Sequence, residues 1–513
     1  RRTQIANTIS NFEFPITNRQ SPNHPITQPP MNPISPAVQE LQKLLGERYV
    51  LWQLDDLRVY SYDGSNNAAT PDVVVLPENA KQISAIIKLA RRYSMAIVPR
   101  GSGTGLCGAV TPIAGGIMIA FARMKKIHNI DLENRTALVE PGVINLDVSA
   151  ALAPYKYFYA PDPSSQAACS IGGNVANNSG GPHCLLYGVT ANHVLGLEVV
   201  LEDGEILWLG GSAPDEQGYD LVAAFIGSEG TLGIITKILV RIMPLPEATR
   251  TLLAIFNTIE QASRTVSGVI GAGVIPAAIE MIDGTTIRAV EAAYNIGLPL
   301  DADAVLLIEV DGPKAGIDEL QQMLADFCLE FGAREVRIAK NEQERADLWK
   351  ARKTALGALG RLAPNYYIQD GVVPRSKLPY VLQQQDTIAK KYNVTIANVL
   401  HAGDGNLHPN ILFDARQEGA LERVKQAGGE ILKLCVDVGG TISGEHGIGL
   451  EKLDYMPLLF QQSDLDAQAK LRDAIAPTRI LNPCKMLPQG SKCGEAAKSK
   501  LPQAIAGNTE VWI

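Results

Sequence analysis

Ala96-Ile-Val-Pro-Arg-Gly-Ser-Gly-Thr-Gly105 is the stretch that decides the fold, because it joins a predicted buried strand to a loop with three glycines. Upstream, residues 73–76 read as a second buried strand and residues 79–93 as an amphipathic helix, which completes a β-α-β unit. Glycine lets the backbone turn tightly, so that successive N–H groups point at an anion. The loop is neither a Walker A sequence nor a Rossmann fingerprint, because no helix with a suitably spaced acidic residue follows. Taken alone, it predicts an anion-binding turn or a plain loop.

The chain contains two further glycine-dense segments, residues 170–181 and 227–236, and their presence favours ligand binding over a plain turn for the first loop. Short predicted strands at 117–120 and 197–201 lie between the three loops. Three such loops on one α+β scaffold suit a long ligand with a pyrophosphate and a flat ring system. A flavin fits this description better than a mononucleotide does.

Histidines form a second cluster of chemistry-bearing residues. His401 and His408 flank Asp404-Gly405, a strong two-residue hairpin signal. In such a hairpin His401 would lie opposite His408, with Cβ atoms about 4.5–5.5 Å apart. Two imidazoles so placed can share one divalent metal with a third carboxylate ligand and an open position. Asn410 would lie on the same face as His408.

Glu445 and His446 follow in the glycine-flanked segment 443–449. In a strand, adjacent residues point to opposite faces, but in a turn they need not. One of the pair could therefore bind a metal while the other acts as a base. The alternative is that these histidines are structural and the chain is a non-catalytic binding module.

Bulk properties narrow the class of protein. A chain of 513 residues predicts two or three domains, and 46% apolar with 19% charged residues is typical of a folded soluble protein. The net charge of −8 argues against nucleic acid as a partner. No apolar run reaches membrane-spanning length, and no Cys-x-x-Cys motif indicates an iron–sulfur cluster. A cytoplasmic protein is expected, with peripheral contact to a membrane left open.

The two ends differ from the body of the chain. Residues 1–35 are rich in proline and predict a disordered leader or an over-extended translation start, with a targeting segment as the alternative. Residues 489–513 predict a loose tail.

The motifs resemble a known family over about residues 36 to 488. Four segments resemble the FAD-binding domain of the vanillyl-alcohol oxidase superfamily, which is also called the p-cresol methylhydroxylase (PCMH) type: residues 99–105, 161–164, 170–174 and 227–234. Residues 401–408 and 443–449 are similar to the C-terminal domain of its D-2-hydroxyacid dehydrogenase branch, which oxidises glycolate, D-lactate or D-2-hydroxyglutarate. The resemblance implies an α+β protein: an N-terminal helix and a two-subdomain FAD-binding domain (36–246), an antiparallel-sheet-and-helix substrate domain (247–434), and a segment that folds back over the flavin (435–488).

The resemblance also implies site residues. FAD contacts would fall on Pro99, Arg100, Gly101, Ser102, Gly103, Thr104, Gly105, Pro161, Asp162, Ser165, Gly172, Gly173, Asn174, Asn178, Gly181, Gly230, Gly233 and Ile234. The first loop lacks the histidine that attaches flavin in covalent relatives, so the FAD would be non-covalent. Zinc or manganese would be held by His401, His408 and Glu445, with His446 as the base and Arg352 and Asn410 on the substrate.

The implied activity is oxidation of glycolate or D-lactate to the 2-oxo acid, by hydride transfer from C2 to flavin. Some relatives place a lysine near Tyr367, where this chain reads Tyr366-Tyr-Ile-Gln369, and its absence disfavours D-2-hydroxyglutarate, which is kept as an alternative. Electrons would pass to a quinone, a cytochrome or an iron–sulfur subunit. A subunit of a glycolate oxidase that is inactive without its iron–sulfur partner is the second alternative, and a homodimer is left open.

Overall fold

The computed structural model describes residues 35–213 and 218–488, and the predicted leader and tail fall almost entirely outside them. The first sheet has the strand order β1 (Val50–Leu51), β2 (Val73–Val75), β4 (Ile117–Ala120), β3 (Ile97–Arg100). Helix α3 (Ala80–Tyr93) joins β2 to β3, and its cap residue Asn79 accepts a hydrogen bond from the Gln82 N–H. The predicted β-α-β unit is therefore confirmed, with β4 inserted between its two strands and parallel to both.

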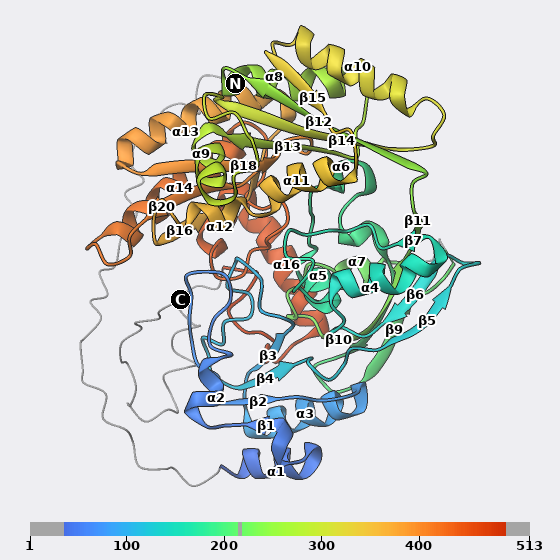
Figure 1. Ribbon diagram of the computed structural model, residues 1–513. Helices are drawn as coiled ribbons and strands as arrows, with labels where there is room; N and C mark the ends of the chain where they lie inside the picture. The colour runs from blue at the N-terminus through green and yellow to red at the C-terminus, as the bar shows by residue number, and fades with distance from the viewer. Residues whose placement is uncertain (1–34, 214–217, 489–513) are drawn as a thin grey trace, which may run out of the picture. The chain divides into compact units, whose positions relative to one another are not determined.

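A second sheet follows, with β6 (Thr136–Val139), β10 (Ile234–Arg241) and β8 (Val194–Val200) at its centre and β5 (Ile127–Asp131) and β9 (Ile206–Gly210) at its edges. The neighbouring elements are α1 (Pro36–Leu45), α2 (Leu54–Arg58), α4 (Asn145–Leu152), α5 (Ile171–Asn177), α6 (Cys184–Tyr187), α7 (Leu221–Phe225), β7 (Tyr157–Phe158) and β11 (Met243–Pro244). All three glycine-rich segments belong to this N-terminal part, in the blue to green range of Figure 1.

The C-terminal part is built on a larger antiparallel sheet. Its strands are β15 (Glu335–Ile338), β12 (Ala248–Phe256), β14 (Ala304–Gly312), β13 (Ala278–Asp283), β18 (Thr395–His401), β19 (Asn406–Leu407) and β17 (Gly371–Val372), with β20 (Pro409–Phe413) and β16 (Asn365–Ile368) continuing from β18. Alternate residues of β12 enter two different apolar clusters, as the two faces of one sheet require. One face packs against α8 (Ile259–Gly271), α10 (Ile317–Glu330), α13 (Leu378–Tyr392) and α14 (Ala420–Asp437), and the other against α9 (Gly284–Tyr294), α11 (Glu342–Lys353) and α12 (Ala355–Leu359).

The last described segment returns to the N-terminal part. Helices α15 (Met456–Leu459) and α16 (Gln462–Ile475) follow the 443–449 turn, and Ile475 at the end of α16 packs against the core of the five-stranded sheet. Leu481 then forms a parallel bridge with Ile97 of β3. This return places the turn with Glu445 and His446 between the glycine-rich loops and the large sheet. Among the described residues, no helix combines the length and the apolarity needed to cross a bilayer.

The predicted register of the histidine hairpin is wrong. His401 pairs with Asn406, so the loop has four residues, Ala402 to Gly405, instead of two. The observed register differs from the predicted one by two residues. Because side chains alternate with a period of two, an even shift leaves His401 and His408 on the same face as diagonal neighbours. Their ring centroids lie 5.0 Å apart.

A partly buried ionic cluster, centred on the buried carboxylate of Glu309, links the two parts of the body. His183, in the loop before α6, contacts Asp162 through Nδ1 (2.7 Å) and Glu309 of β14 through Nε2 (3.2 Å). Glu309 also accepts two hydrogen bonds from Arg345 of α11 (both 2.8 Å) and one from the Trp349 indole (2.6 Å). The cluster therefore fixes the loop against the sheet and α11.

Replacing His183 by glutamine is expected to lower the melting temperature more at pH 6 than at pH 9.5. Burial disfavours the charged imidazole, but Asp162 and Glu309 outweigh this and raise the His183 pKa to about 10. A raised pKa stabilises the folded state fully below the unfolded value of about 6.5, and the contribution is lost as pH rises toward the folded value. Thermal unfolding of both proteins at the two pH values checks this, and a difference that grows with pH would contradict it.

Candidate functional site

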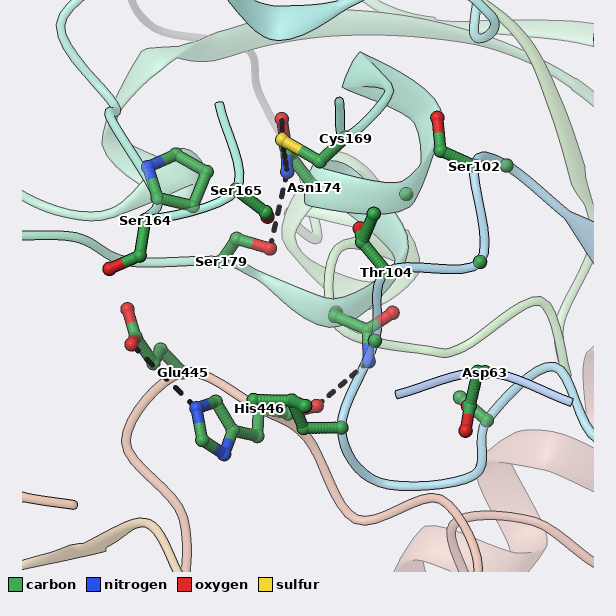
Figure 2. A pocket seen from close by; sticks show the side chains of 18 of the residues that line it. Asp63, Ser102, Thr104, Ser164, Ser165, Cys169, Asn174, Ser179, Glu445 and His446 are labelled. Carbon is green, nitrogen blue, oxygen red and sulfur yellow. Dashed lines mark hydrogen bonds and ion pairs between the residues drawn. The ribbon is translucent and has the colours of Figure 1, made fainter. Parts of the chain in front are cut away.

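A cavity of about 320 Å³ lies where the glycine-rich loops meet the 443–449 turn. Its lining comes from both parts of the body and includes Gly101, Ser170, Asn177, Leu356, Val399 and His446. Figure 2 shows Ser102 and Thr104 on the loop after β3, with Glu445 and His446 on a separate segment across the cavity. This volume falls in the range of about 300–1,000 Å³ that is usual for ligand sites.

The loop after β3 lines the cavity through its backbone and small side chains. Gly103 has φ +74°, a conformation that favours glycine, and a Cβ there would also collide with the Arg100 guanidinium. Arg100 itself turns away to donate to the Tyr62 carbonyl (2.7 Å) and does not line the cavity. An anionic ligand at this loop would therefore be met by backbone N–H groups, which is the arrangement of anion-binding nests. The loop fits the pyrophosphate of a dinucleotide such as FAD.

The predicted site residues divide into two groups. Those that line the cavity are Gly101, Ser102, Gly103, Thr104, Gly105, Ser165, Gly173, Asn174, Arg352, His408, Glu445 and His446. The others, Pro99, Arg100, Pro161, Asp162, Gly172, Asn178, Gly181, Gly230, Gly233, Ile234, His401 and Asn410, do not.

Several members of the second group hold the lining loops in place. A Cβ on Gly172 would lie 2.5 Å from Pro141 Cβ, and one on Gly181 would lie 2.5 Å from the Asp162 carbonyl oxygen. Asn178 ends α5 with φ +52° and accepts a hydrogen bond from the Ala191 N–H (2.9 Å). These residues allow close approaches between the loops that surround the cavity.

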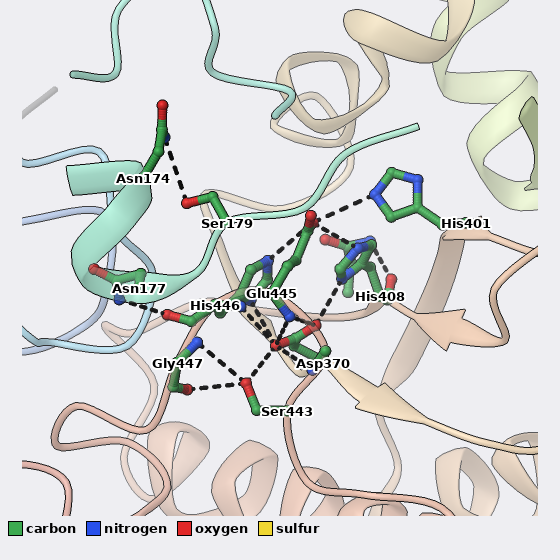
Figure 3. A network of polar contacts seen from close by, with 12 residues as sticks. Asn174, Asn177, Ser179, Asp370, His401, His408, Ser443, Glu445, His446 and Gly447 are labelled. Atoms are coloured by element: carbon green, nitrogen blue, oxygen red, sulfur yellow. Dashed lines mark hydrogen bonds and ion pairs between the residues drawn. The ribbon is translucent and has the colours of Figure 1, made fainter. Parts of the chain in front are cut away.

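His401, His408 and Glu445 converge on one point. Glu445 Oε1 lies 3.3 Å from His401 Nε2 and 3.2 Å from His408 Nε2, although β18 and the 443–449 turn are far apart in sequence (Figure 3). One ligand atom of each residue lies within 4.8 Å of the others. Two imidazoles and one carboxylate form the donor set of a three-ligand metal site with an open position.

Unsatisfied polar atoms support this interpretation. Both His408 nitrogens and Glu445 Oε2 are buried and form no well-formed hydrogen bond with any residue in the described part of the chain. Buried polar atoms in native proteins normally have hydrogen-bond partners, so three such atoms close together indicate a bound ion or water at this point. The residues present fit a divalent metal.

A second group of potential ligands, Asp370, His408 and His446, is less suited to a metal. Lys452 Nζ lies 3.0 Å from Asp370 Oδ2, so a cation already occupies that side of the carboxylate. Asp370 Oδ2 also accepts hydrogen bonds from Ser443 Oγ (2.8 Å) and from the N–H groups of Gly444 (3.0 Å), Glu445 (3.1 Å) and His446 (2.8 Å). Asp370 thus holds the 443–447 turn, and with it both Glu445 and His446 (Figure 3).

Charges in the site follow from these contacts. Burial opposes ionisation of both His401 and Glu445. At His401 the carboxylates of Glu280 and Glu445 outweigh burial and raise the pKa to about 10, and at Glu445 the neighbouring His401 and His408 hold the pKa well below its usual value. Burial lowers the pKa of His446 to about 4, despite the nearby carboxylate of Asp370. His446, whose ring stacks on that of His408 at 4.9 Å, therefore has a neutral imidazole.

Arg352 lines the cavity, but part of its guanidinium is already engaged. Its Nε donates to Glu280 of β13, and NH2 lies 3.4 Å from His401 Nδ1. Asn410 is fully buried. Its Nδ2 donates to the carbonyls of Ala397 (3.1 Å) and His408 (2.8 Å), while Oδ1 has no hydrogen-bond partner among residues 35–213 and 218–488.

Sequence reasoning missed Glu280, Asp370 and the cavity residues Asp63, Cys169, Asn177 and Ser179. Glu280 carried a usable signal, because it is the one charged residue in the apolar run Ala278-Ile-Glu-Met-Ile282. A charge in a buried strand needs a partner. The others carry no comparable signal.

Comparison with known proteins defines the class first. Residues 71–210 match the FAD binding domain family, and residues 245–486 match the family of FAD linked oxidases, C-terminal domain. The fold is similar to that of 4-ethylphenol oxidase from Gulosibacter chungangensis (TM-score 0.73, 17% identity, 89% of this chain and 97% of that one). It is also similar to that of p-cresol methylhydroxylase (TM-score 0.73, 18% identity, 87% of this chain and 95% of that one). The predicted fold class, a PCMH-type FAD-binding domain with a C-terminal sheet-and-helix domain, is confirmed.

Sequence relatives narrow the class further. The chain is 45% identical to glycolate oxidase subunit GlcD of Escherichia coli (strain K12) over 86% of this chain and 89% of that one. It is 44% identical to GlcD of Bacillus subtilis (strain 168), over 85% and 93% of the two chains. It is 30% identical to the mitochondrial D-lactate dehydrogenase [cytochrome] of Arabidopsis thaliana, over 82% and 74%. The chain belongs to the FAD-linked oxidases, an oxidoreductase family within the vanillyl-alcohol oxidase superfamily.

Proposed function

We propose that this protein is an FAD- and divalent-metal-dependent dehydrogenase that oxidises a small 2-hydroxy acid, glycolate or D-lactate, to the 2-oxo acid. The observation that carries the proposal is the convergence of His401, His408 and Glu445 on one point. His408 and Glu445, together with His446, line the cavity that the glycine-rich loops also line. The names of the relatives, glycolate oxidase subunit and D-lactate dehydrogenase, agree with it.

Each residue then has a role. A bound flavin supplies the hydride acceptor, and a divalent metal held by His401, His408 and Glu445 lowers the pKa of the substrate hydroxyl. The free edge of the Arg352 guanidinium binds the substrate carboxylate with charge-assisted hydrogen bonds. His446 accepts the hydroxyl proton on its imidazole.

Anaerobic reduction of the bound flavin tests the proposal. Glycolate, D-lactate, L-lactate and D-2-hydroxyglutarate are added in turn to the purified protein, before and after treatment with a chelator. Bleaching by glycolate or D-lactate is expected, with loss after chelation and recovery on adding Zn²⁺ or Mn²⁺. Bleaching that ignores the chelator would contradict the metal role of the three ligands.

The substrate panel also distinguishes the narrower alternatives. Lys353 lines the cavity beside Arg352 and offers a second cation, so bleaching by D-2-hydroxyglutarate alone would move the substrate class to dicarboxylates. The relative from Escherichia coli is named a subunit, which supports an electron-accepting partner chain such as an iron–sulfur subunit, whereas the relative from Arabidopsis thaliana is named for cytochrome, which supports direct transfer to that acceptor. A protein whose flavin bleaches but turns over with an acceptor only after a partner chain is added would establish that form of the enzyme.

A further inference from the structure

We infer that Glu280 is a positioning residue that orients a metal ligand and the substrate-binding arginine at the same time. The inference rests on the proposed metal site and adds to it a residue that touches neither substrate nor metal. Glu280 is completely buried at the centre of β13. One of its oxygens, Oε1, lies 2.8 Å from His401 Nδ1, and the other forms an ion pair with Arg352.

The sheet register explains the first contact. Glu280 and His401 are direct cross-strand partners in the antiparallel pair β13–β18, so their side chains leave the same face of the sheet. The Nδ1–H of His401 can then donate to Glu280, which leaves the lone pair on Nε2 for a ligand. Nε2 is the nitrogen that faces Glu445. A carboxylate behind a metal-bound histidine fixes the tautomer and the ring orientation in this way.

The second contact sets the orientation of Arg352. Helix α11 packs over the same face of the sheet, and its buried Arg352 meets Glu280 through Nε. NH1 makes no hydrogen bond with any described residue, so this edge of the guanidinium is left for an anion in the cavity that Arg352 lines. One buried carboxylate therefore controls both the metal ligand and the substrate clamp.

The fold contains a matched cluster that lacks the site. Arg345, two helical turns before Arg352 on α11, pairs with Glu309 on the neighbouring strand β14, and Glu309 contacts His183. Both clusters consist of an arginine, a buried glutamate and a histidine, but neither Glu309 nor His183 belongs to a potential metal site among the described residues. Glu309→Gln is thus a control for the loss of a buried, arginine-paired carboxylate as such.

The test measures Zn²⁺ binding to the FAD-loaded protein without substrate, by competition with a chromophoric chelator, for wild type, E280Q and E309Q. Loss of a carboxylate behind a metal-bound histidine typically weakens metal affinity about 10–100-fold, so E280Q is expected to show that loss and E309Q the wild-type affinity. The KM for the hydroxy acid, measured at saturating metal, is expected to rise in E280Q and to stay unchanged in E309Q.

The possible outcomes separate this inference from the proposed function. Equal Zn²⁺ affinity and equal KM in wild type and E280Q would overturn the role of Glu280. A wild-type protein that binds no Zn²⁺ or Mn²⁺ would overturn the metal-dependent function instead. If E280Q and E309Q weaken Zn²⁺ binding alike, the effect is a general loss of stability and the inference also fails. Melting temperatures of both variants show that each comparison is made on folded protein.

Discussion

Replacement of His446 by alanine is expected to lower kcat for glycolate or D-lactate by about 10²–10⁴-fold, the usual contribution of a general base. His446 lines the cavity next to the convergent ligands, and burial keeps its imidazole neutral and able to accept a proton. Because the three metal ligands stay in place, FAD and metal contents are expected to match those of wild type. Stopped-flow flavin reduction measures the step directly.

His128→Gln is a suitable control for that variant, since His128 lies on β5 and contacts only Glu140 among the described side chains. H128Q is expected to retain the wild-type rate of flavin reduction. If H446A reduced flavin as fast as wild type, another group would have to accept the proton. If H446A lost its metal, His446 would be a ligand and the assignment of the base would fail.

Replacement of Asp370 by asparagine is expected to remove both metal binding and turnover and to destabilise the fold. Three consecutive N–H groups, one hydroxyl and the Lys452 ammonium converge on Asp370 Oδ2. An asparagine would offer these donors one neutral amide oxygen, which makes weaker hydrogen bonds, in place of a carboxylate oxygen, and Lys452, almost completely buried, would lose its counter-ion. Breaking a buried ion pair from one side costs about 3–5 kcal/mol. Urea unfolding and metal analysis of purified D370N check these effects.

A double variant separates stability from function at this position. D370N/K452M removes the unpaired ammonium along with the carboxylate, so its unfolding free energy is expected to recover part of the D370N loss. Metal content and kcat are expected to stay low, because the turn that carries Glu445 and His446 still lacks the charged carboxylate that accepts its N–H groups. Wild-type metal content in D370N would show that the turn is held without Asp370.

Local sequence patterns predicted much of the fold. The β-α-β unit before the first loop and strands β4 and β8 follow from apolar patterning, which is a property of neighbouring residues. The pairing of the histidine hairpin was misread because Asp404-Gly405 signals a two-residue turn, whereas backbone hydrogen bonds from Asp404 to His401 and from Gly405 to Ala402 close a wider one. Both histidines still lie on the same face of the sheet, because the predicted register differs from the observed one by two residues, an even number.

The candidate site was predictable only in part. His401, His408, Glu445 and His446 stand out in glycine-rich segments, so their residue types and spacing indicate chemistry without any knowledge of the fold. The glycines of residues 101–105 carry a similar local signal. Arg100, in contrast, is predicted from the sequence to bind an anion, but in the structure its guanidinium donates a hydrogen bond to the Tyr62 carbonyl.

By itself, the sequence of this protein determined which residues are able to bind a metal, accept a proton or wrap a pyrophosphate, because those abilities belong to side chains and short loops. The tertiary structure decided which of them meet. Glu280 faces His401 through strand register, and Asp370 holds a turn more than seventy residues away through contacts that close only when the chain returns to the glycine-rich loops. A buried carboxylate is stable only where positively charged or hydrogen-bond-donating partners surround it. Those partners are distant in the sequence, so local patterns do not predict which of them the fold places beside the carboxylate.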